Sequence, residues 1–412
     1  MRYFSITIWG RIILFGFLAV TLFAEISCKS RSFNADDQLE YCVRQADLAL
    51  SQIRSDSTFP QNIPTDSENW RYSTRQAWTS GFWPGILWYL YQYTQDNRWK
   101  VGAARFTRAL TPDAYRSGFT HDLGFVLYDS FGRGYESTGN LEYKEVLLAA
   151  ADSLATLFNP KVGTILSWPA MVGKMGWPHN TIIDNMMNLE LLFWAAKNGG
   201  GERLYEIAVR HAATTMKNQF RPDYSNYHVV VYDTADGSVV KKITHQGYSD
   251  SSMWARGQAW AIYGFTMVYR ETHQSAFLDF AQHVADIYIK RLPDDMIPYW
   301  DFDAPHGSDV PKDASAAAIT ASALLELSTY VRDENKAHAY YNDAVNMLKE
   351  LSSDRFQSRK QNDAFLMHST GNKPANSEVD ISIIYADYYY LEALLRLRKL
   401  DNNEPLFAGH KI

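Results

Sequence analysis

The stretch WPHNTIIDNMMNLELLFWAA, from Trp177 to Ala196, is apolar on every side of the helix that its spacing predicts. A helix that is apolar all round is typical of one buried inside a larger protein. The same stretch carries Asp184, Asn185 and Asn188 in its first turns. Buried polar groups cost free energy unless they have a hydrogen-bond partner or contact a ligand. The stretch therefore predicts an inner helix with a functional group at its beginning.

The same kind of pattern continues along most of the chain. Apolar residues recur at three- and four-residue spacing, and clusters of Gly, Pro and Asn interrupt them. The predicted helices cover residues 39–53, 81–94, 101–110, 142–157, 182–197, 203–218, 256–272, 276–291, 314–331, 337–352 and 382–399.

These helices predict an all-α fold in a single domain over residues 36–402, because no long Pro- or Ser-rich linker divides them. Their number favours an (α/α)6 barrel, a toroid of six helical hairpins. An α-solenoid would show a strict repeat of fixed period, and none is visible. A short β-hairpin is predicted near residues 227–244, where two Val-rich runs flank Asp236-Gly237.

The N-terminus has the outline of a secretory signal peptide over residues 1–28. Two arginines and an apolar run from Ile12 to Ala24 precede small residues. Cys28 stands where a bacterial lipoprotein carries its lipid anchor, but Glu25 occupies a position where Leu is usual, so plain export and acylation both stay open. We expect an exported protein, periplasmic or associated with the outer membrane. No segment is a transmembrane candidate, since the apolar run is too short.

The charge and the metal-binding residue types exclude several function classes. The formal net charge is −6, so no global basic field attracts nucleic acid or a membrane. The 11 histidines are scattered, with no His-Glu-x-x-His motif and no cysteine pair, and no glycine-rich phosphate loop is present. We therefore expect neither a metal nor a cofactor. The sequence does not indicate an oligomeric state.

Two carboxylates at the starts of buried helices are the candidates for chemistry. Asp184 has an alternative as a capping residue, because Thr181 as the N-cap would place it at the third helical position. Asp122 follows His121 in SGFTHDLGFVLYDS, ahead of another apolar helical run, and has the same two interpretations. Such a pair suits chemistry in which one acid donates a proton while the other tunes its pKa.

A third cluster lies in THQGYSDSSMWARGQAW, residues 244–260. It supplies Gln246, Arg256 and Trp260, and Arg256 leads into an apolar helix whose N-terminus would favour an anionic group. The alternative is that Arg256 pairs with a structural acid. Trp78, in the loop before Gly81, is the best candidate for stacking on a sugar ring.

Five stretches together resemble a known family. WTSGFWPG, HDLGF, IIDNMMNLELLFWA, THQGYSDSSMWARGQAW and SEVDISIIYADYYYLEALLR follow one another over nearly all of the mature chain. They resemble glycoside hydrolase family 88, the unsaturated glucuronyl hydrolases. The resemblance implies an (α/α)6 barrel that removes a 4,5-unsaturated uronic acid from the non-reducing end of oligosaccharides left by polysaccharide lyases. The substrate would be of the glycosaminoglycan type.

The resemblance also implies residue roles. Asp184 would protonate C4 of the vinyl ether, water would add at C5, and the resulting hemiketal would collapse. This needs a raised pKa, to which an apolar wall and the charge of Asp122 would both contribute. The implied contacts to the unsaturated sugar are Trp78, His121, His228, Gln246, Arg256 and Trp260.

A late loop bears on sulfate recognition in the same family. The corresponding residues here are Ser369 to Lys373, STGNK, with Asn372 where a second Ser is expected. Lys373 is a candidate contact, and sulfate preference stays open.

Three other functions are compatible with part of this pattern. A hydrolase of unsaturated rhamnogalacturonan products is closely related. A sugar epimerase would want histidine bases on facing inner helices, which are not seen. A non-catalytic sugar-binding helical protein would keep the aromatic residues but would need neither Asp184 nor Asp122.

Overall fold

The computed structural model describes residues 33–53, 55–305, 307 and 309–407. The predicted signal peptide, including Cys28, lies outside these residues. The described chain from Ala35 onward belongs to one compact unit.

Two sets of helices alternate along the described chain. Those of the first set are buried on nearly every side over most of their length: α2 (Phe82–Thr94), η2 (Gly124–Gly132), α7 (Asn185–Ala195), α9 (Ala255–Thr272), α11 (Ala314–Ser328) and α13 (Ile384–Asp401). The short helix α4 (Arg133–Thr138) continues η2 and is buried only at its first two residues. Those of the second set bury one face: α1 (Ala35–Gln52), α3 (Asn97–Ala109), α5 (Leu141–Ala155), α8 (Glu202–Asn218), α10 (Ser275–Lys290) and α12 (Glu334–Leu351).

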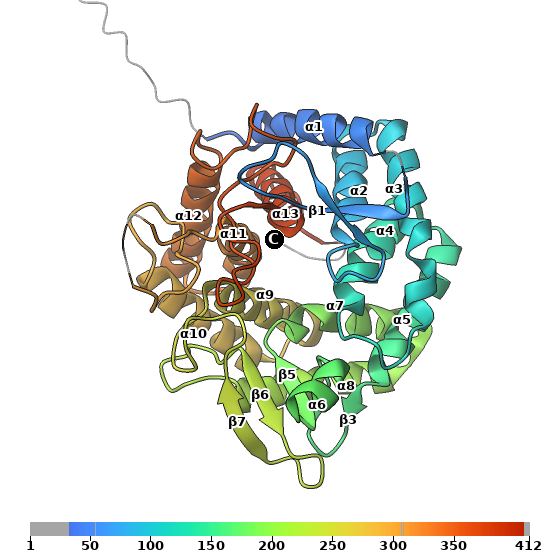
Figure 1. The fold of residues 1–412 in the computed structure, drawn as a ribbon, viewed down its shortest axis with the longest axis vertical. Coiled ribbons are helices and arrows are strands. Elements are labelled where there is room, and N and C mark those ends of the chain that lie inside the picture. Colours follow the sequence, from blue (N-terminus) through green and yellow to red (C-terminus); the bar gives the residue numbers. More distant parts are fainter. Residues whose placement is uncertain (1–32, 54, 306, 308, 408–412) are drawn as a thin grey trace, which may run out of the picture. The chain divides into compact units, whose positions relative to one another are not determined.

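The buried set forms a closed inner ring. Each inner helix contacts the next one along the chain, and α13 contacts α2 and so closes the circle. In Figure 1 the colours run round this unit from blue α1 and α2 through green α5 and α8 to red α13. The outer helices cover the ring, which confirms the predicted (α/α)6 barrel.

Sequence pattern explains which helix lies inside. In α11, ASAAAITASALLELS, every residue from Ala314 to Leu327 is buried, because small and apolar side chains occupy all sides. In α12 the buried residues include Tyr340, Ala344, Met347 and Leu351, which share one face at three- and four-residue spacing.

Short helices and strands fill the connections. The short helices are η1 (Thr111–Tyr115), α6 (Pro169–Met175) and η3 (Ala196–Gly200). The strands form three antiparallel sheets in the orders β2-β1-β8, β3-β4 and β5-β6-β7. They are β1 (Thr58–Ile63), β2 (Arg71–Thr74), β3 (Phe158–Asn159), β4 (Thr164–Ile165), β5 (His179–Ile182), β6 (Val229–Tyr232), β7 (Val239–Ile243) and β8 (Ser382–Ile383).

The predicted hairpin is confirmed as β6 and β7, but it has a third strand. β5 pairs with β6 from His179↔Tyr232 to Ile182↔Val229. Thr181 therefore lies in a strand, where its hydroxyl contacts that of Thr164 at 2.8 Å. The alternative in which Thr181 caps the following helix is therefore wrong, because Thr181 and Ile182 pair with a strand later in the chain.

Glycines let the inner helices approach closely at their N-terminal ends. A Cβ atom on Gly81 would lie 2.0 Å from the carbonyl oxygen of Phe125, and one on Gly124 would lie 2.6 Å from the Cα of Asn188. Any larger residue would push α2, η2 and α7 apart. The glycines of the TSGF and HDLGF motifs therefore set the spacing of the ring.

Candidate active site

The functional candidates gather at the N-terminal ends of the inner helices. Each inner helix is followed by an outer helix that packs against the ring and returns, so the inner helices share one direction. Polar or aromatic residues stand at or just before these ends: Trp78 before α2, Asp122 before η2, Asp184 before α7, Arg256 in α9, Asp313 before α11 and Tyr385 in α13.

Asp184 is mostly buried and does not cap its helix. It occupies the N-cap position of α7 without a side-chain capping bond, and its side chain is 15% exposed. Among the described residues, its Oδ2 atom has no hydrogen-bond partner. Burial raises the pKa of Asp184 to about 7; the positive charge of Arg256 limits the rise, and the charge of Asp122 adds to it. The carboxyl is therefore able to hold a proton near neutral pH.

Asp122 lies beside His121 rather than capping η2. Its Oδ1 is 3.2 Å from Nε2 of His121, and its Oδ2 accepts a hydrogen bond of 2.9 Å from the hydroxyl of Thr120. Burial lowers the pKa of His121, which is fully buried, and the charge of Asp122 opposes that effect. The structure thus brings a second carboxylate close enough to act on Asp184.

The backbone fixes the tautomer of His228. Its Nδ1 atom accepts hydrogen bonds from the backbone N–H groups of His245 (3.2 Å) and Gln246 (3.1 Å). Burial lowers the pKa of His228 well below its usual value, so the ring is neutral and its only proton is on Nε2. That Nε2–H group lies 3.7 Å from Oδ2 of Asp184. His228 therefore presents a donor, not a base, beside the proton-holding carboxyl.

Arg256 clamps the late loop. Its guanidinium donates to Oδ2 of Asp313 at 3.0 Å and to the carbonyl oxygens of Thr370 and Gly371. Its side chain is 2% exposed. The alternative that Arg256 pairs with a structural acid is therefore the one that the structure shows, and the acid is Asp313. Burial by itself would lower the pKa of Arg256, but Tyr385, Asp313 and Asp184 raise it, and the net effect is an increase. Arg256 therefore stays charged and contributes positive potential at the site.

Aromatic rings line the same region. The ring of Trp78 lies 5.0 Å from that of Tyr385 and 5.3 Å from that of Phe125, and the ring of Trp260 lies 5.3 Å from that of Phe125 on the other side. Trp78 is half-buried, whereas Trp260 is fully buried. The indole of Trp260 is near enough to Asp184 to oppose the rise of its pKa.

The two asparagines after Asp184 have structural partners. Oδ1 of Asn188 accepts the backbone N–H of Phe125 at 3.0 Å and so satisfies a free donor in the first turn of η2. Asn185 donates to the carbonyl oxygen of Ile165 and to Ser167, at 3.1 Å each. The polar row on this inner helix thus ties α7 to its neighbours and leaves Asp184 as the group without such a bond.

Gln246 contacts the clamped loop, and Lys373 is the last residue of that loop. The side chain of Gln246 reaches the carbonyl oxygen of Gly371 at 3.4 Å. Lys373 is half-buried and lines a cavity of about 390 Å³ with Lys312, Arg355 and other residues. The structure thus places Lys373 next to the site residues along the chain but in a neighbouring cavity.

Sequence reasoning missed two residues that the structure adds. The hydroxyl of Tyr385 is buried without a hydrogen-bond partner among the described residues, and its ring lies 5.4 Å from the guanidinium of Arg256. Asp313 anchors both Arg256 and the backbone N–H of Thr370. Both stand at the start of a fully buried helix, which is the signal that singled out Asp184.

Comparison with known proteins decides the family. A family model described as Glycosyl Hydrolase Family 88 matches residues 54–395. The chain belongs to this family.

Family 88 relatives match over most of their length. An unsaturated glucuronyl hydrolase from Formosa agariphila is 46% identical over 349 residues, which are 84% of this chain and 86% of that protein. One from Bacillus sp. strain GL1 is 33% identical over 83% of this chain and 91% of its own. A crystal structure of an unsaturated glucuronyl hydrolase specific for heparin has a TM-score of 0.85 at 42% identity, over 89% of this chain and 98% of that one.

Family 88 membership makes the chain a glycoside hydrolase. Within the described residues, no three His, Cys, Asp or Glu side chains are grouped as a metal site would require. The helices of that same part of the chain are also too short or too polar to cross a membrane.

Proposed function

We propose that this protein is an unsaturated glucuronyl hydrolase in which Asp184 protonates the substrate alkene. The substrate class is an oligosaccharide of the glycosaminoglycan type with a 4,5-unsaturated uronic acid at its non-reducing end. The observation that carries the proposal is a buried carboxyl with a pKa of about 7, whose Oδ2 has no hydrogen-bond partner among the described residues. The 46% identity to an unsaturated glucuronyl hydrolase supports the same activity.

The reaction follows from the charge states of the site. Asp184 gives its proton to C4, the C4=C5 electron pair forms the new C–H bond, and the ring oxygen shares the positive charge left at C5. Water then forms a C–O bond to C5 and returns a proton to the Asp184 carboxylate. The hemiketal at C5 then opens to a ketone and leaves a hemiacetal at C1. This hemiacetal breaks down to an aldehyde and so releases the leaving sugar. Asp184 ends the cycle protonated, as it began.

Neighbouring residues support this step. The neutral His228 keeps its Nε2–H directed at the region of Asp184, where it can donate to the substrate or to the attacking water. Arg256 and the helix N-termini supply positive potential for the uronate carboxylate. Trp78 offers the half-buried ring on which the sugar would stack.

Replacing Asp184 tests the proposal. We expect Asp184→Asn to lower kcat/KM by about 10³-fold, because general acid catalysis contributes about 10²- to 10⁴-fold, while binding of the disaccharide persists. The measurement is loss of the alkene ultraviolet absorbance with unsaturated disaccharides from heparin, chondroitin, hyaluronan and rhamnogalacturonan.

The matched control is Asp279→Asn, an exposed carboxylate on the outer helix α10, which should keep full turnover. Unchanged turnover in Asp184→Asn would overturn the role of this residue. Binding without turnover in the unaltered protein would favour a non-catalytic sugar-binding protein. Turnover of the rhamnogalacturonan product alone would change the proposed substrate class from glycosaminoglycan-type oligosaccharides to rhamnogalacturonan products.

We also propose that the chain is exported, on the ground of its apolar run from Ile12 to Ala24. The intact mass of the mature protein tests this. A chain that retains residues 1–27 contradicts it, and a lipid mass on Cys28 distinguishes the acylated form from plain export.

A further inference from the structure

A cavity of about 600 Å³ lies outside the inner ring, beside the outer helix α3. Its walls come from the segment before β1, from the end of β2 with the residues that follow, and from the last turns of α3. The lining residues are Asp56, Ser57, Thr74, Arg75, Gln76, Arg105, Arg108 and Ala109. None of them belongs to the site built around Asp184.

The cavity is positive in a protein that is negative. Three arginines and one aspartate line it, which gives a formal charge of +2 against −6 for the whole chain. Arg75 is bound to Asp113 at 2.7 Å. Arg105 and Arg108 are exposed, and within the described residues no carboxylate forms an ion pair with either of them. The side chain of Arg108 also interacts with the hydroxyl of Tyr143. No described carboxylate neutralises either arginine, so both charges can attract an anionic ligand.

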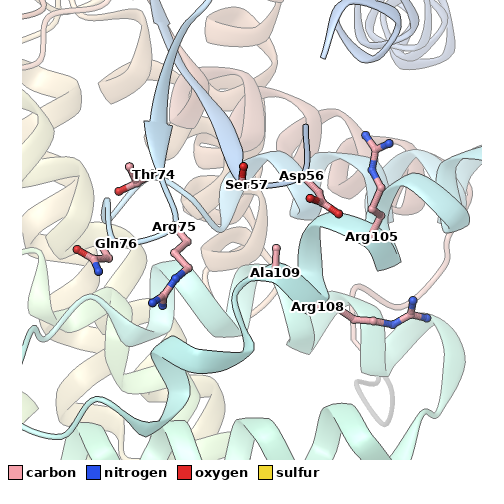
Figure 2. A pocket seen from close by; sticks show the side chains of 8 residues that line it. All are labelled: Asp56, Ser57, Thr74, Arg75, Gln76, Arg105, Arg108 and Ala109. Carbon is pink, nitrogen blue, oxygen red and sulfur yellow. The ribbon is translucent and has the colours of Figure 1, made fainter. Parts of the chain in front are cut away.

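The arginines are spread along the cavity rather than gathered at one point. Figure 2 shows the side chains of Arg75, Arg105 and Arg108 leaving in different directions around the small Ala109. The guanidinium of Arg105 also lies over the ring of Phe106, 4.7 Å from its centroid, which restrains it. Separated charges of this kind suit an extended ligand with several anionic groups better than one small ion.

Neutral polar side chains also line the cavity. Ser57, Thr74 and Gln76 bring two hydroxyl groups and one amide, which are donors and acceptors suited to sugar hydroxyls. No aromatic ring is among the lining residues, so a nucleic-acid base would find nothing to stack on.

The cavity lies at the same end of the barrel as the active site. The chain enters α2 at that end, and α3 returns beside α2, so the last turn of α3 lies next to the beginning of α2. Gln76 is also only two residues from Trp78 along the chain. The wall of the cavity that contains Gln76 is therefore continuous along the chain with the segment that carries Trp78.

We propose that this arginine cavity is a second saccharide-binding site, which holds a chain of sulfated or carboxylated sugars while the active site acts on chain ends. The choice of ligand rests on the proposed function, since an enzyme that consumes lyase products works beside the acidic polymer that gives rise to them. The site would raise the residence time on that polymer and would take no part in the hydrolysis of a disaccharide.

The test compares two double variants of the full-length protein. Arg105→Gln/Arg108→Gln removes two charges from the cavity, and Arg203→Gln/Arg332→Gln removes two from exposed positions elsewhere. The dissociation constants for intact heparin, hyaluronan and neutral dextran are measured at one ionic strength. In parallel, kcat/KM is measured on an unsaturated heparin disaccharide.

We expect the cavity variant to bind heparin at least tenfold more weakly and the control variant to change less than twofold, with disaccharide turnover equal in both. Equal heparin binding by the two variants overturns the proposal, as does equal binding of heparin and dextran by the unaltered protein. Loss of disaccharide turnover in the cavity variant would assign the arginines to the active site and also overturn it. If the unaltered protein binds heparin but turns over no disaccharide, the proposed function fails while the binding site stands.

Discussion

At the scale of single residues, the chemistry depends on how one carboxyl is solvated. The sequence predicted a raised pKa for Asp184 from an apolar wall and from the charge of Asp122, and both effects are present, with burial the larger. The tautomer of His228 was not predictable. It depends on two backbone N–H groups of a loop that follows much later in the sequence, and the residues next to His228 give no sign of that contact. The engagement of Arg256 with the carbonyls of residues 370 and 371 was hidden for the same reason.

The raised pKa has a consequence for stability. In the unfolded chain Asp184 ionises near 3.8, and in the folded protein near 7, so the folded state binds its proton more tightly. The loss of stability caused by ionising the buried carboxyl is absent below both pKa values and complete above pH 7. One pKa unit corresponds to about 1.4 kcal/mol, so ionisation of the buried carboxyl costs roughly 4 kcal/mol.

We therefore expect Asp184→Asn to gain stability relative to the unaltered protein as the pH rises from 4 to 8. The measurement is urea unfolding across this range, with Asp279→Asn as the control. A difference in unfolding free energy that stays constant with pH would show that the carboxyl is not buried as described.

At the scale of helices and strands, local pattern succeeded where partners are local. The predicted helix at 203–218 is α8, Glu202–Asn218, and that at 276–291 is α10, Ser275–Lys290, because a one-sided apolar stripe fixes both. The helix predicted from residue 182 begins instead at Asn185, since β5 pairs with a strand much later in the chain. A helix whose sides are all apolar gives no stripe, so its start is the hardest boundary to place.

The close approach of η2 and α7 makes Gly124 a sensitive position. A methyl group there would lie 2.6 Å from the backbone of Asn188, one turn from Asp184. We expect Gly124→Ala to destabilise the protein by about 1 to 3 kcal/mol, as overpacking does, and to lower kcat/KM by moving the first turn of α7. Urea unfolding and disaccharide turnover measure the two effects.

The control for that substitution is Gly173→Ala in the exposed helix α6, where an added Cβ meets nothing within 4 Å. It should leave stability equal or slightly higher. If both alanine variants behaved alike, the proximity of η2 and α7 would not be what limits residue 124.

At the scale of the whole barrel, the two ends of the inner ring differ in kind. Ion pairs join the inner helices farther along their length: Arg270, near the end of α9, binds Glu190 in the middle of α7 and Glu326 near the end of α11, and Arg396 of α13 binds Glu326 as well. The N-terminal ends also hold an ion pair, Arg256 with Asp313, but beside it lie the half-buried ring of Trp78 and a carboxyl, Asp184, whose Oδ2 has no hydrogen-bond partner among the described residues. These groups at the N-terminal ends are the ones left to contact a ligand.

The number of helices and the lack of a strict repeat favoured this architecture over an α-solenoid, because a closed ring buries every side of its inner helices. The arginine cavity beside α3 could not be predicted, since its residues come from three segments that only the fold brings together.

The central claim is that Asp184 works as an acid held protonated by burial. Its most direct test is the pH dependence of kcat/KM for the unaltered protein on an unsaturated disaccharide. Since the protonated form is the active one, kcat/KM should fall above about pH 7, by up to tenfold for each further pH unit. A value that stays constant or rises through pH 9 would contradict the account.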